Sequence, residues 1–250
     1  MSIALETRGL CKSFGALTVA EKIDFRLDAG ARHALIGPNG AGKTTFVNML
    51  TGRLAPSSGQ ILMAGDDITA LGQAARVKLG LGRTFQINSL FRNLSVLDNV
   101  ALSVAERRGV GGRMWRPAGA YREIREESLS LLETLGIAGD AGVRVLDLPY
   151  GKQRLVEIAI ALGLNPAVLL LDEPAAGVPS MESARILQVL DKLPEEIAIL
   201  IIEHDMDLVF RFARRITVLV QGEVLCEGTP VEIAADKRVH QVYLGEGRHG

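Results

Sequence analysis

The sequence predicts an α/β protein with a mostly parallel sheet, and three features of its 250 residues support that prediction. Short apolar runs alternate with helical patterns along the chain, which indicates βαβ units with helices on both faces of a sheet. Two of these runs, residues 169–171 and 199–202, are apolar without alternation, as in strands that are buried on both faces. A glycine-rich loop, residues 37–45, separates another apolar run from a helical pattern.

The predicted strands and helices follow one another in a regular order. Three strand–helix pairs are expected, at residues 31–36 and 44–50, 167–171 and 180–193, and 197–202 and 206–213. Residues 216–220 and 223–226, joined by Gln221-Gly222, predict a hairpin. Thr229-Pro230-Val231-Glu232 then predicts a helix start, with a threonine N-cap, proline at N1 and glutamate at N3.

Between about residues 69 and 146 the pattern becomes helical and more polar. Ser95-Val96-Leu97-Asp98 predicts a capping box and a helix to about Arg107, and residues 121–135 predict a second amphipathic helix. The Gly- and Arg-rich stretch between them contains Trp115 and predicts a mobile loop near Gly111-Gly112. We therefore expect one domain of residues 1–250, with a helical subdomain at about residues 87–163 inserted in the α/β core. A short hairpin and helix extension is expected at residues 216–250.

Composition limits the class of protein. Lys plus Arg is 28 and Asp plus Glu is 29, so the net charge of −1 argues against a nucleic-acid binder. Hydrophobic residues make up 48% of the chain, enough for a sizeable core. Cys11 and Cys226 have no metal-ligand spacing, which fits a reduced compartment. No membrane span or signal peptide is visible, so we expect a soluble protein or one that reaches a membrane through a partner.

The glycine-rich loop predicts nucleotide binding. Gly37-Pro38-Asn39-Gly40-Ala41-Gly42-Lys43-Thr44-Thr45 fits the phosphate-binding pattern G-x-x-x-x-G-K-[ST]. Its glycines let the backbone close around a polyphosphate with N–H groups pointing inward. Lys43 would reach the β and γ phosphates, and the Thr44 hydroxyl would hold Mg²⁺. A glycine-rich turn can match this pattern by chance, but here a predicted strand precedes it and a predicted helix follows it.

Acidic and polar residues follow three other predicted strands. Asp172 and Glu173 end a buried run, where Asp172 would bind Mg²⁺ and Glu173 would polarise an attacking water as general base. His204 ends another run, at the edge where parallel sheets bind ligands. Gln86 follows a short strand-like segment and would reach Mg²⁺ or water. Taken singly, Asp172 and Glu173 could be two solvated acids at the end of a strand, and His204 could be a structural histidine.

In this order the motifs resemble the nucleotide-binding subunit of an ABC transporter, over essentially the whole chain. The glycine-rich loop matches Walker A, Gln86 the glutamine loop, residues 169–173 Walker B, residues 175–178 the loop after it, and His204 the switch histidine. Phe14, which by itself would be taken for a core residue, matches the aromatic that stacks on adenine. The resemblance implies a P-loop NTPase core, antiparallel N-terminal β elements and an inserted helical subdomain. It also implies ATP and Mg²⁺ as cofactors.

Several segments are similar to the larger ATPase subunit of branched-chain (hydrophobic) amino acid importers, and urea and amide importers share much of this pattern. They are Gly82–Gln86, Tyr150-Gly151, residues 172–177, 204–207 and 226–230, and the terminal residues 242–245. The resemblance implies ATP hydrolysis that energises solute uptake at the cytoplasmic face of a bacterial inner membrane. It implies two permease subunits and, indirectly, a periplasmic binding protein as partners. A soluble non-transport ABC ATPase, an exporter ATPase and a nucleotide-controlled docking subunit with weak hydrolysis are the alternatives.

The signature segment, residues 148–153, departs from the family pattern. The family signature begins Leu-Ser and ends Gly-Gln, whereas this chain has Pro149 and Lys152 at those places. In the family, ATP lies between the Walker A loop of one subunit and the signature of the other, so Pro149, Tyr150 and Gly151 would contact ATP in trans in a homodimer or heterodimer. Proline has no N–H or hydroxyl to donate, yet it suits a helix start. Two interpretations stay open: the family fold simply tolerates Pro149, or Pro149 weakens the ATP site that this signature completes in trans.

Overall fold

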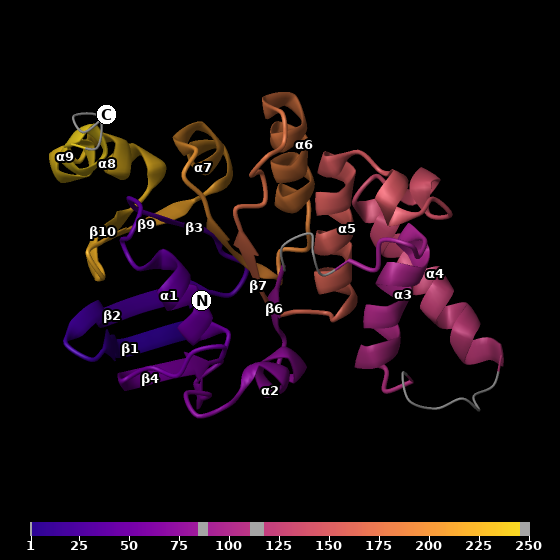
Figure 1. Cartoon of the computed structure of the whole chain (residues 1–250), viewed down its shortest axis with the longest axis horizontal. Coiled ribbons are helices and arrows are strands. Elements are labelled where there is room, and N and C mark those ends of the chain that lie inside the picture. Colours follow the sequence, from indigo (N-terminus) through magenta and orange to yellow (C-terminus); the bar gives the residue numbers. More distant parts are fainter. Residues whose placement is uncertain (1, 85–89, 111–117, 246–250) are drawn as a thin grey trace. The chain divides into compact units, whose positions relative to one another are not determined.

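A computed structural model describes residues 2–84, 90–110 and 118–245 (Figure 1). The chain divides into two units, one formed by Met1–Arg76 with Pro194–Gly250 and the other by Val77–Leu193. Parallel strands, antiparallel strands and helices are all present, so the predicted α/β class is confirmed. In the described ranges, no helix is long and apolar enough to cross a membrane.

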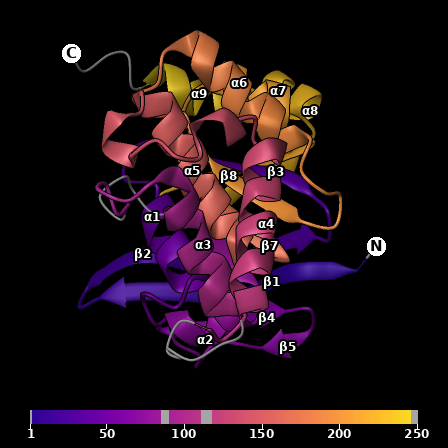
Figure 2. The same cartoon turned by 90° about the vertical axis from the view of Figure 1, so that its right-hand side faces the viewer.

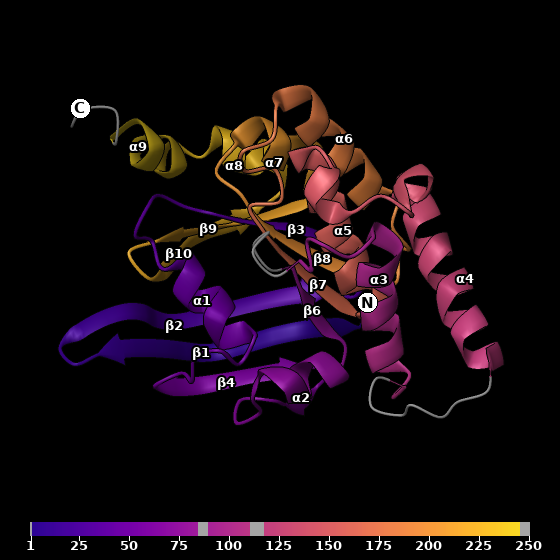
Figure 3. The ribbon, with the colours of Figure 1, turned by 45° about the vertical axis from the view of Figure 1, so that its right-hand side comes forward.

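The first unit begins with an antiparallel sheet of strand order β2-β1-β4-β5, of which Figure 3 labels β2, β1 and β4. Its strands are β1 (Ile3–Phe14), β2 (Leu17–Asp28), β4 (Ser58–Met63) and β5 (Asp66–Asp67). The central strand β1 pairs antiparallel with β2 and with β4, which confirms the expected antiparallel N-terminal elements. Several register shifts interrupt the β1–β2 ladder. They break the strict alternation by which long strands are found in a sequence.

The parallel strands of the first unit lie beside β3 (Arg32–Ile36). This strand pairs in parallel with β8 (Ala198–Ile202) on one side and β9 (Arg215–Val220) on the other. Every residue of β3 and β8 is buried, as the continuous apolar runs predict. A turn at residues 221–222 joins β9 to the antiparallel β10 (Glu223–Gly228), which confirms the predicted hairpin.

Within the described part of the first unit, five helices lie wholly or partly: α1 (Lys43–Leu50), α2 (Gln73–Lys78), α7 (Met206–Phe212), α8 (Pro230–Ala235) and α9 (Lys237–Gly245). The predicted N-cap of α8 is confirmed. The Thr229 hydroxyl accepts a hydrogen bond from the Glu232 amide, and the Glu232 carboxylate accepts one from the Thr229 amide. Residue patterns had indicated α1, α7 and α8, whereas α2 and α9 were not predicted.

A buried arginine fixes the C-terminal end of α1, the helix that follows the glycine-rich loop. Arg76 is only 1% exposed. Its Nη1 donates to the carbonyls of Met49 at 2.6 Å and Leu50 at 2.7 Å, two acceptors of the last helical turn, of which the Met49 carbonyl also accepts from the Gly52 amide at 3.1 Å. Its Nε and Nη2 donate to the carbonyls of Leu71 and Thr69, both at 2.9 Å. Burial lowers the pKa of Arg76, and these carbonyls offset part of the cost of removing the guanidinium from water.

The second unit combines two parallel strands with a group of helices. Strand β6 (Leu81–Arg83) pairs in parallel with β7 (Val168–Asp172). The helices are α3 (Val96–Arg107), α4 (Ala118–Thr134), α5 (Tyr150–Gly163) and α6 (Ser180–Asp191), with short 3-10 turns at Ala138–Asp140 and Val145–Asp147. Helix α3 packs on both α4 and α5 (Figure 2). Ser95 is the N-cap of α3, as predicted, since its hydroxyl accepts from the Asp98 amide at 3.0 Å. The predicted capping box is not complete, because the Asp98 carboxylate accepts from the Ser95 hydroxyl at 2.6 Å instead of from the Ser95 amide.

Element boundaries differ from the predicted ones by one to three residues. Helix α4 begins three residues before the expected start at residue 121, and α6 ends two residues before residue 193. The expected mobile loop at Gly111-Gly112 lies outside the described residues. The proposed extent of the helical subdomain, about 87–163, its insertion in a single domain of residues 1–250 and the extension at 216–250 stay predictions.

Candidate nucleotide-binding site

The glycine-rich loop connects β3 to α1 in the first unit, as predicted. Two of its glycines lie where no larger residue fits. A Cβ on Gly37 (φ 154°) would lie 2.1 Å from the Leu219 carbonyl oxygen, and one on Gly42 (φ 97°) would lie 2.7 Å from the Val19 carbonyl oxygen. Gly42 is also the N-cap of α1. The loop therefore needs glycine to pass this close to the strands, and its backbone N–H groups precede a helix N-terminus that favours anions.

The side chains of the loop divide between its interior and its surface. The Lys43 ammonium donates to the carbonyls of Gly37 at 2.5 Å and Pro38 at 2.9 Å, so it spans its own loop. Asn39, Gly40 and Thr44 are exposed, while Ala41 is buried and Thr45 is half-buried. Phosphate oxygens that reach Lys43 would replace the two carbonyls, since an ammonium group offers only three donors.

Phe14 and His204 also belong to the first unit. Phe14, the last residue of β1, is 51% exposed, which excludes the core position that a lone phenylalanine would suggest and leaves its ring accessible, as the expected stacking on adenine requires. Its ring lies 5.1 Å from the Lys12 ammonium, a cation–π distance. The side chain of His204 is 65% exposed, two residues beyond β8. Strands β3 and β8 are parallel neighbours, so His204 and the glycine-rich loop follow the same sheet edge.

Asp172 and Glu173 lie at the carboxyl end of β7 in the second unit. The Asp172 Oδ2 accepts a hydrogen bond of 2.8 Å from Arg83 Nη2, at the end of β6. Glu173 is exposed and has φ of 47°. A left-handed backbone is unfavourable for a residue with a Cβ, and such strain is found most often at functional sites. Gln86 lies outside the described residues.

The signature residues form the start of α5. Pro149 is its N-cap, with φ −55° and ψ 150°. The Tyr150 ring lies 5.3 Å from the Arg154 guanidinium carbon, and its hydroxyl accepts from Arg154 Nη2 at 3.1 Å. A Cβ on Gly151 would lie 2.2 Å from a carboxylate oxygen of Glu182 on α6, so a larger residue would require the Glu182 side chain to move.

Two contacts of the second unit involve residues whose partners the sequence did not reveal. Lys152, at the place of the family glutamine, forms an ion pair of 2.7 Å with Asp140. Arg83 was noted as part of a subfamily segment but had no assigned role. A basic residue in a three-residue, largely buried strand was a signal that it has a partner.

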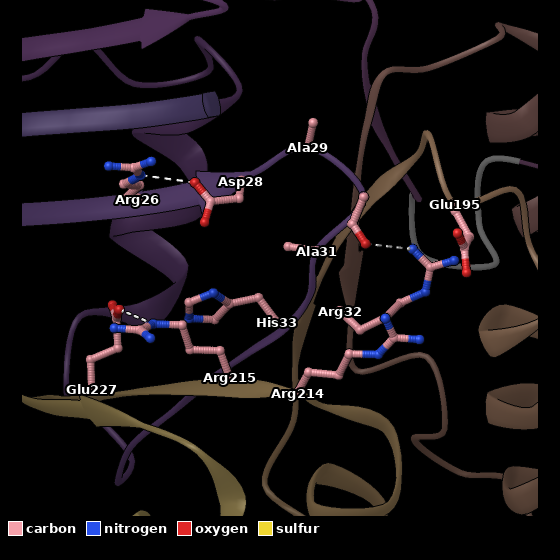
Figure 4. Close-up of a pocket in the computed structure, with 11 residues that line it drawn as sticks. Arg26, Asp28, Ala29, Ala31, Arg32, His33, Glu195, Arg214, Arg215 and Glu227 are labelled. Atoms are coloured by element: carbon pink, nitrogen blue, oxygen red, sulfur yellow. Dashed lines mark hydrogen bonds and ion pairs between the residues drawn. The ribbon is translucent and has the colours of Figure 1, made fainter. Parts of the chain in front are cut away.

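A separate hollow of about 540 Å³ lies where β3 begins, at the opposite end of that strand from the glycine-rich loop (Figure 4). His33 lines it and is buried, and its pKa is lowered from 6.5 to about 4, mainly by burial, with Arg215 acting in the same direction and Glu227 and Asp28 opposing the shift. The nearby charges are paired as Arg26 with Asp28 and Arg215 with Glu227. Ligands of parallel sheets bind at carboxyl ends of strands, so this hollow is not the nucleotide site.

Comparison with known proteins covers both units. The ABC transporter family model matches residues 20–176, and the model of the branched-chain amino acid ATP-binding cassette transporter matches residues 223–249. The chain is 36% identical to the branched-chain amino acid transport ATP-binding protein LivG of Escherichia coli over 251 residues, which span 97% of this chain and 98% of LivG. BraF of Pseudomonas aeruginosa gives the same identity and coverage.

Solved structures are similar over the same length. The ADP conformation of MJ1267, an ATP-binding cassette of an ABC transporter, has a TM-score of 0.86 and 29% identity, covering 98% of this chain and 100% of that one. The cassette MJ0796 in a dimeric post-hydrolysis state with ADP and Pi has a TM-score of 0.73 and 25% identity, covering 90% of this chain and 98% of that one. The chain therefore belongs to the ABC transporter family, as one of its ATP-hydrolysing cassettes.

Proposed function

We propose that this cassette powers an importer for branched-chain or other hydrophobic amino acids, or for related small solutes. The observation that carries the proposal is the similarity to LivG and BraF, which extends over 97% of the chain. The separate match of residues 223–249 to the branched-chain transporter family supports the same substrate class. Urea and amides remain the nearest alternative solutes.

ATP would bind to the glycine-rich loop. Gly37, Pro38, Asn39, Gly40, Ala41, Gly42, Lys43, Thr44 and Thr45 would surround the phosphates, and Phe14 would stack on adenine through its exposed ring. Thr44, Gln86 and Asp172 would hold Mg²⁺, which when bound offsets the negative charge of the phosphates. Hydroxyl, amide and carboxylate oxygens suit this ion. Across the described residues, no group of three His, Cys, Asp or Glu could hold a metal.

Hydrolysis would depend on four side chains of this cassette. Glu173 would act as general base and take a proton from the attacking water. His204, exposed beyond β8, would contact the γ-phosphate, and Gln86 would orient the water or the metal. Lys43 would exchange its two loop carbonyls for phosphate oxygens.

The assembly we propose is a dimer of cassettes, homomeric or with a paralogous ATPase, bound to two permease subunits. A periplasmic binding protein would deliver the solute, and no nucleic acid takes part. The cassette would lie at the cytoplasmic face of a bacterial inner membrane, attached through the permeases. Pro149, Tyr150 and Gly151 would complete the ATP site of the partner cassette, while the partner's signature would complete the site of Lys43 and Glu173.

Pro149 favours unequal sites in such a dimer. A hydrogen bond to a charged group contributes about 1.5–3 kcal/mol, and proline at this position can donate none. The site completed by this chain's signature would then be the weaker one. The same observation favours a second candidate function, a nucleotide-controlled docking subunit with weak hydrolysis.

Reconstitution tests the proposed function. The complex of this chain with its paralogous ATPase and permeases is placed in proteoliposomes, and ATP hydrolysis and uptake of labelled leucine are measured together. We expect uptake that stops with Glu173→Gln, since this variant removes the general base. ATP-dependent uptake of urea without leucine would assign another substrate, and hydrolysis unaffected by Glu173→Gln would contradict the assigned base.

The effect of Pro149 is tested in the same complex. Pro149→Ser should raise turnover, because serine restores a donor to the trans site. Its effect on stability should be small, since a serine N-cap contributes about 1 kcal/mol and loss of proline costs about 0.4–1 kcal/mol. Pro179→Ser is the matched control, since Pro179 is the N-cap of α6 with φ −57° and ψ 144°. Unchanged turnover and unchanged ATP affinity would show that Pro149 is simply tolerated.

A further inference from the structure

The ion pair between Arg83 and Asp172 has no place in the mechanism described above. Arg83 Nη2 lies 2.8 Å from Asp172 Oδ2, and the two side chains are 12% and 31% exposed. The contact is therefore a charge-assisted hydrogen bond that is partly shielded from water, where it is stronger than on an open surface. It engages the carboxylate that the proposed function assigns to Mg²⁺.

The sheet register places the two residues together. In the parallel pair of β6 and β7, Arg83 lies opposite Leu170. Asp172 is two residues further along β7 and so projects from the same face of the sheet as Leu170. A long arginine side chain spans that offset, whereas a shorter residue would not. The pairing of β6 with β7 brings the two residues together, so the contact is part of the fold.

We propose that Arg83 is a positioning residue that competes with Mg²⁺ for Asp172. In the metal-free cassette the guanidinium holds the Asp172 carboxylate and compensates its charge. A divalent cation at the same carboxylate meets like charge from Arg83, so it binds only at the expense of this pair. Arg83 thereby lowers the affinity of the nucleotide-loaded site for Mg²⁺ and keeps the carboxylate aligned when the metal is absent.

This inference rests on the proposed role of Asp172, and one binding experiment tests both. The dissociation constant of ADP is measured by fluorescence with a labelled ADP, once with Mg²⁺ and once with EDTA. The ratio of the dissociation constant in EDTA to that in Mg²⁺ reports how strongly the metal supports nucleotide binding. Asp172→Asn should bring that ratio close to one, and Arg83→Met should raise it by about tenfold, equivalent to about 1.4 kcal/mol, because the competing cation is gone.

Matched variants distinguish competition between Arg83 and Mg²⁺ from nonspecific destabilisation of the protein. Arg83→Lys keeps a positive charge and should raise the ratio less than Arg83→Met. Arg144→Met removes the exposed ion pair with Asp147, 2.9 Å long in the same unit, and should leave the ratio unchanged. Arg83→Gln provides a second neutral variant if Arg83→Met does not fold. Circular dichroism and gel filtration establish that each variant is folded.

Thermal unfolding in EDTA supplies a readout that needs no nucleotide. Arg83→Met, Asp172→Asn and the double variant form a cycle, and a real ion pair makes the two losses in melting temperature non-additive. Additive losses would show that the pair does not exist in solution. An unchanged or lower Mg²⁺ ratio in both neutral Arg83 variants would overturn the competition, while an unchanged ratio in Asp172→Asn would refute the metal role of Asp172 itself.

Discussion

His33 should make the first unit less stable below neutral pH, because its imidazole is enclosed in a neutral form. The ring is only 1% exposed, and its Nε2 lies 2.8 Å from the Thr217 hydroxyl. That hydroxyl donates its single hydrogen to Glu227 at 2.8 Å, so it must accept from His33. The Nε2 atom therefore carries the proton, and a second proton would have to go to Nδ1 of a buried ring.

The size of the effect follows from the pKa. Burial lowers the pKa of His33 from 6.5 to about 4. Between these values the unfolded chain binds more protons than the folded one, so stability falls as the pH decreases through this window. Arg215 favours the neutral ring, while Glu227 and Asp28 favour the charged one. At about pH 5, the difference in proton binding amounts to about 2 kcal/mol of lost stability.

The comparison that isolates this loss uses His33→Gln. Glutamine can donate to Thr217 as histidine does, but it does not titrate. Urea unfolding followed by circular dichroism at about pH 7.5 and pH 5 should show a loss larger in the wild type than in the variant by about 2 kcal/mol. Equal losses in the two proteins would refute the reasoning. An NMR titration that gives His33 a pKa near its ordinary value of 6.5 would also refute the reasoning.

Three further predictions concern packing, backbone strain and helix capping. Arg76→Met should destabilise the protein by about 1–3 kcal/mol, because it removes the Arg76 donor from the Leu50 carbonyl and one of two donors from the Met49 carbonyl at the end of α1; Arg76→Lys should cost less, and equal unfolding midpoints for wild type and Arg76→Met would contradict this account. Glu173→Asn should be more stable than Glu173→Gln by about 0.5–1 kcal/mol, since asparagine tolerates the left-handed backbone better; equal melting temperatures would show that residue 173 is unstrained. Ser95→Ala should cost about 1 kcal/mol and Ser95→Gly only a few tenths, measured by urea unfolding, and an equal loss in both would exclude a capping role.

Local chemistry made several features predictable from the sequence alone. The glycine-rich loop has its predicted place between β3 and α1, and the caps at Ser95 and Thr229 form as expected. These features depend on residues within a few positions of one another, such as a hydroxyl and the amide three residues later. Continuous apolar runs likewise identified β7 and β8, because strands covered on both faces exclude polar residues.

Other features were beyond prediction because they depend on partners far away in the chain. The length of β1 and β2 was hidden by register shifts that interrupt their alternation. The exposure of Phe14 depends on where the hairpin places its end, so residue type alone would have suggested a core residue and only the family resemblance indicated an accessible ring.

Short patterns with fixed spacing were enough to identify the cassette family, the phosphate loop and the acidic and polar candidates. Which charged residues meet became visible only in the folded chain. Arg83 reaches Asp172 across 89 positions, and Arg76 reaches Met49 across 27. Such contacts depend on strand register and on how a helix end is closed, and neither leaves a periodic signal in the chain.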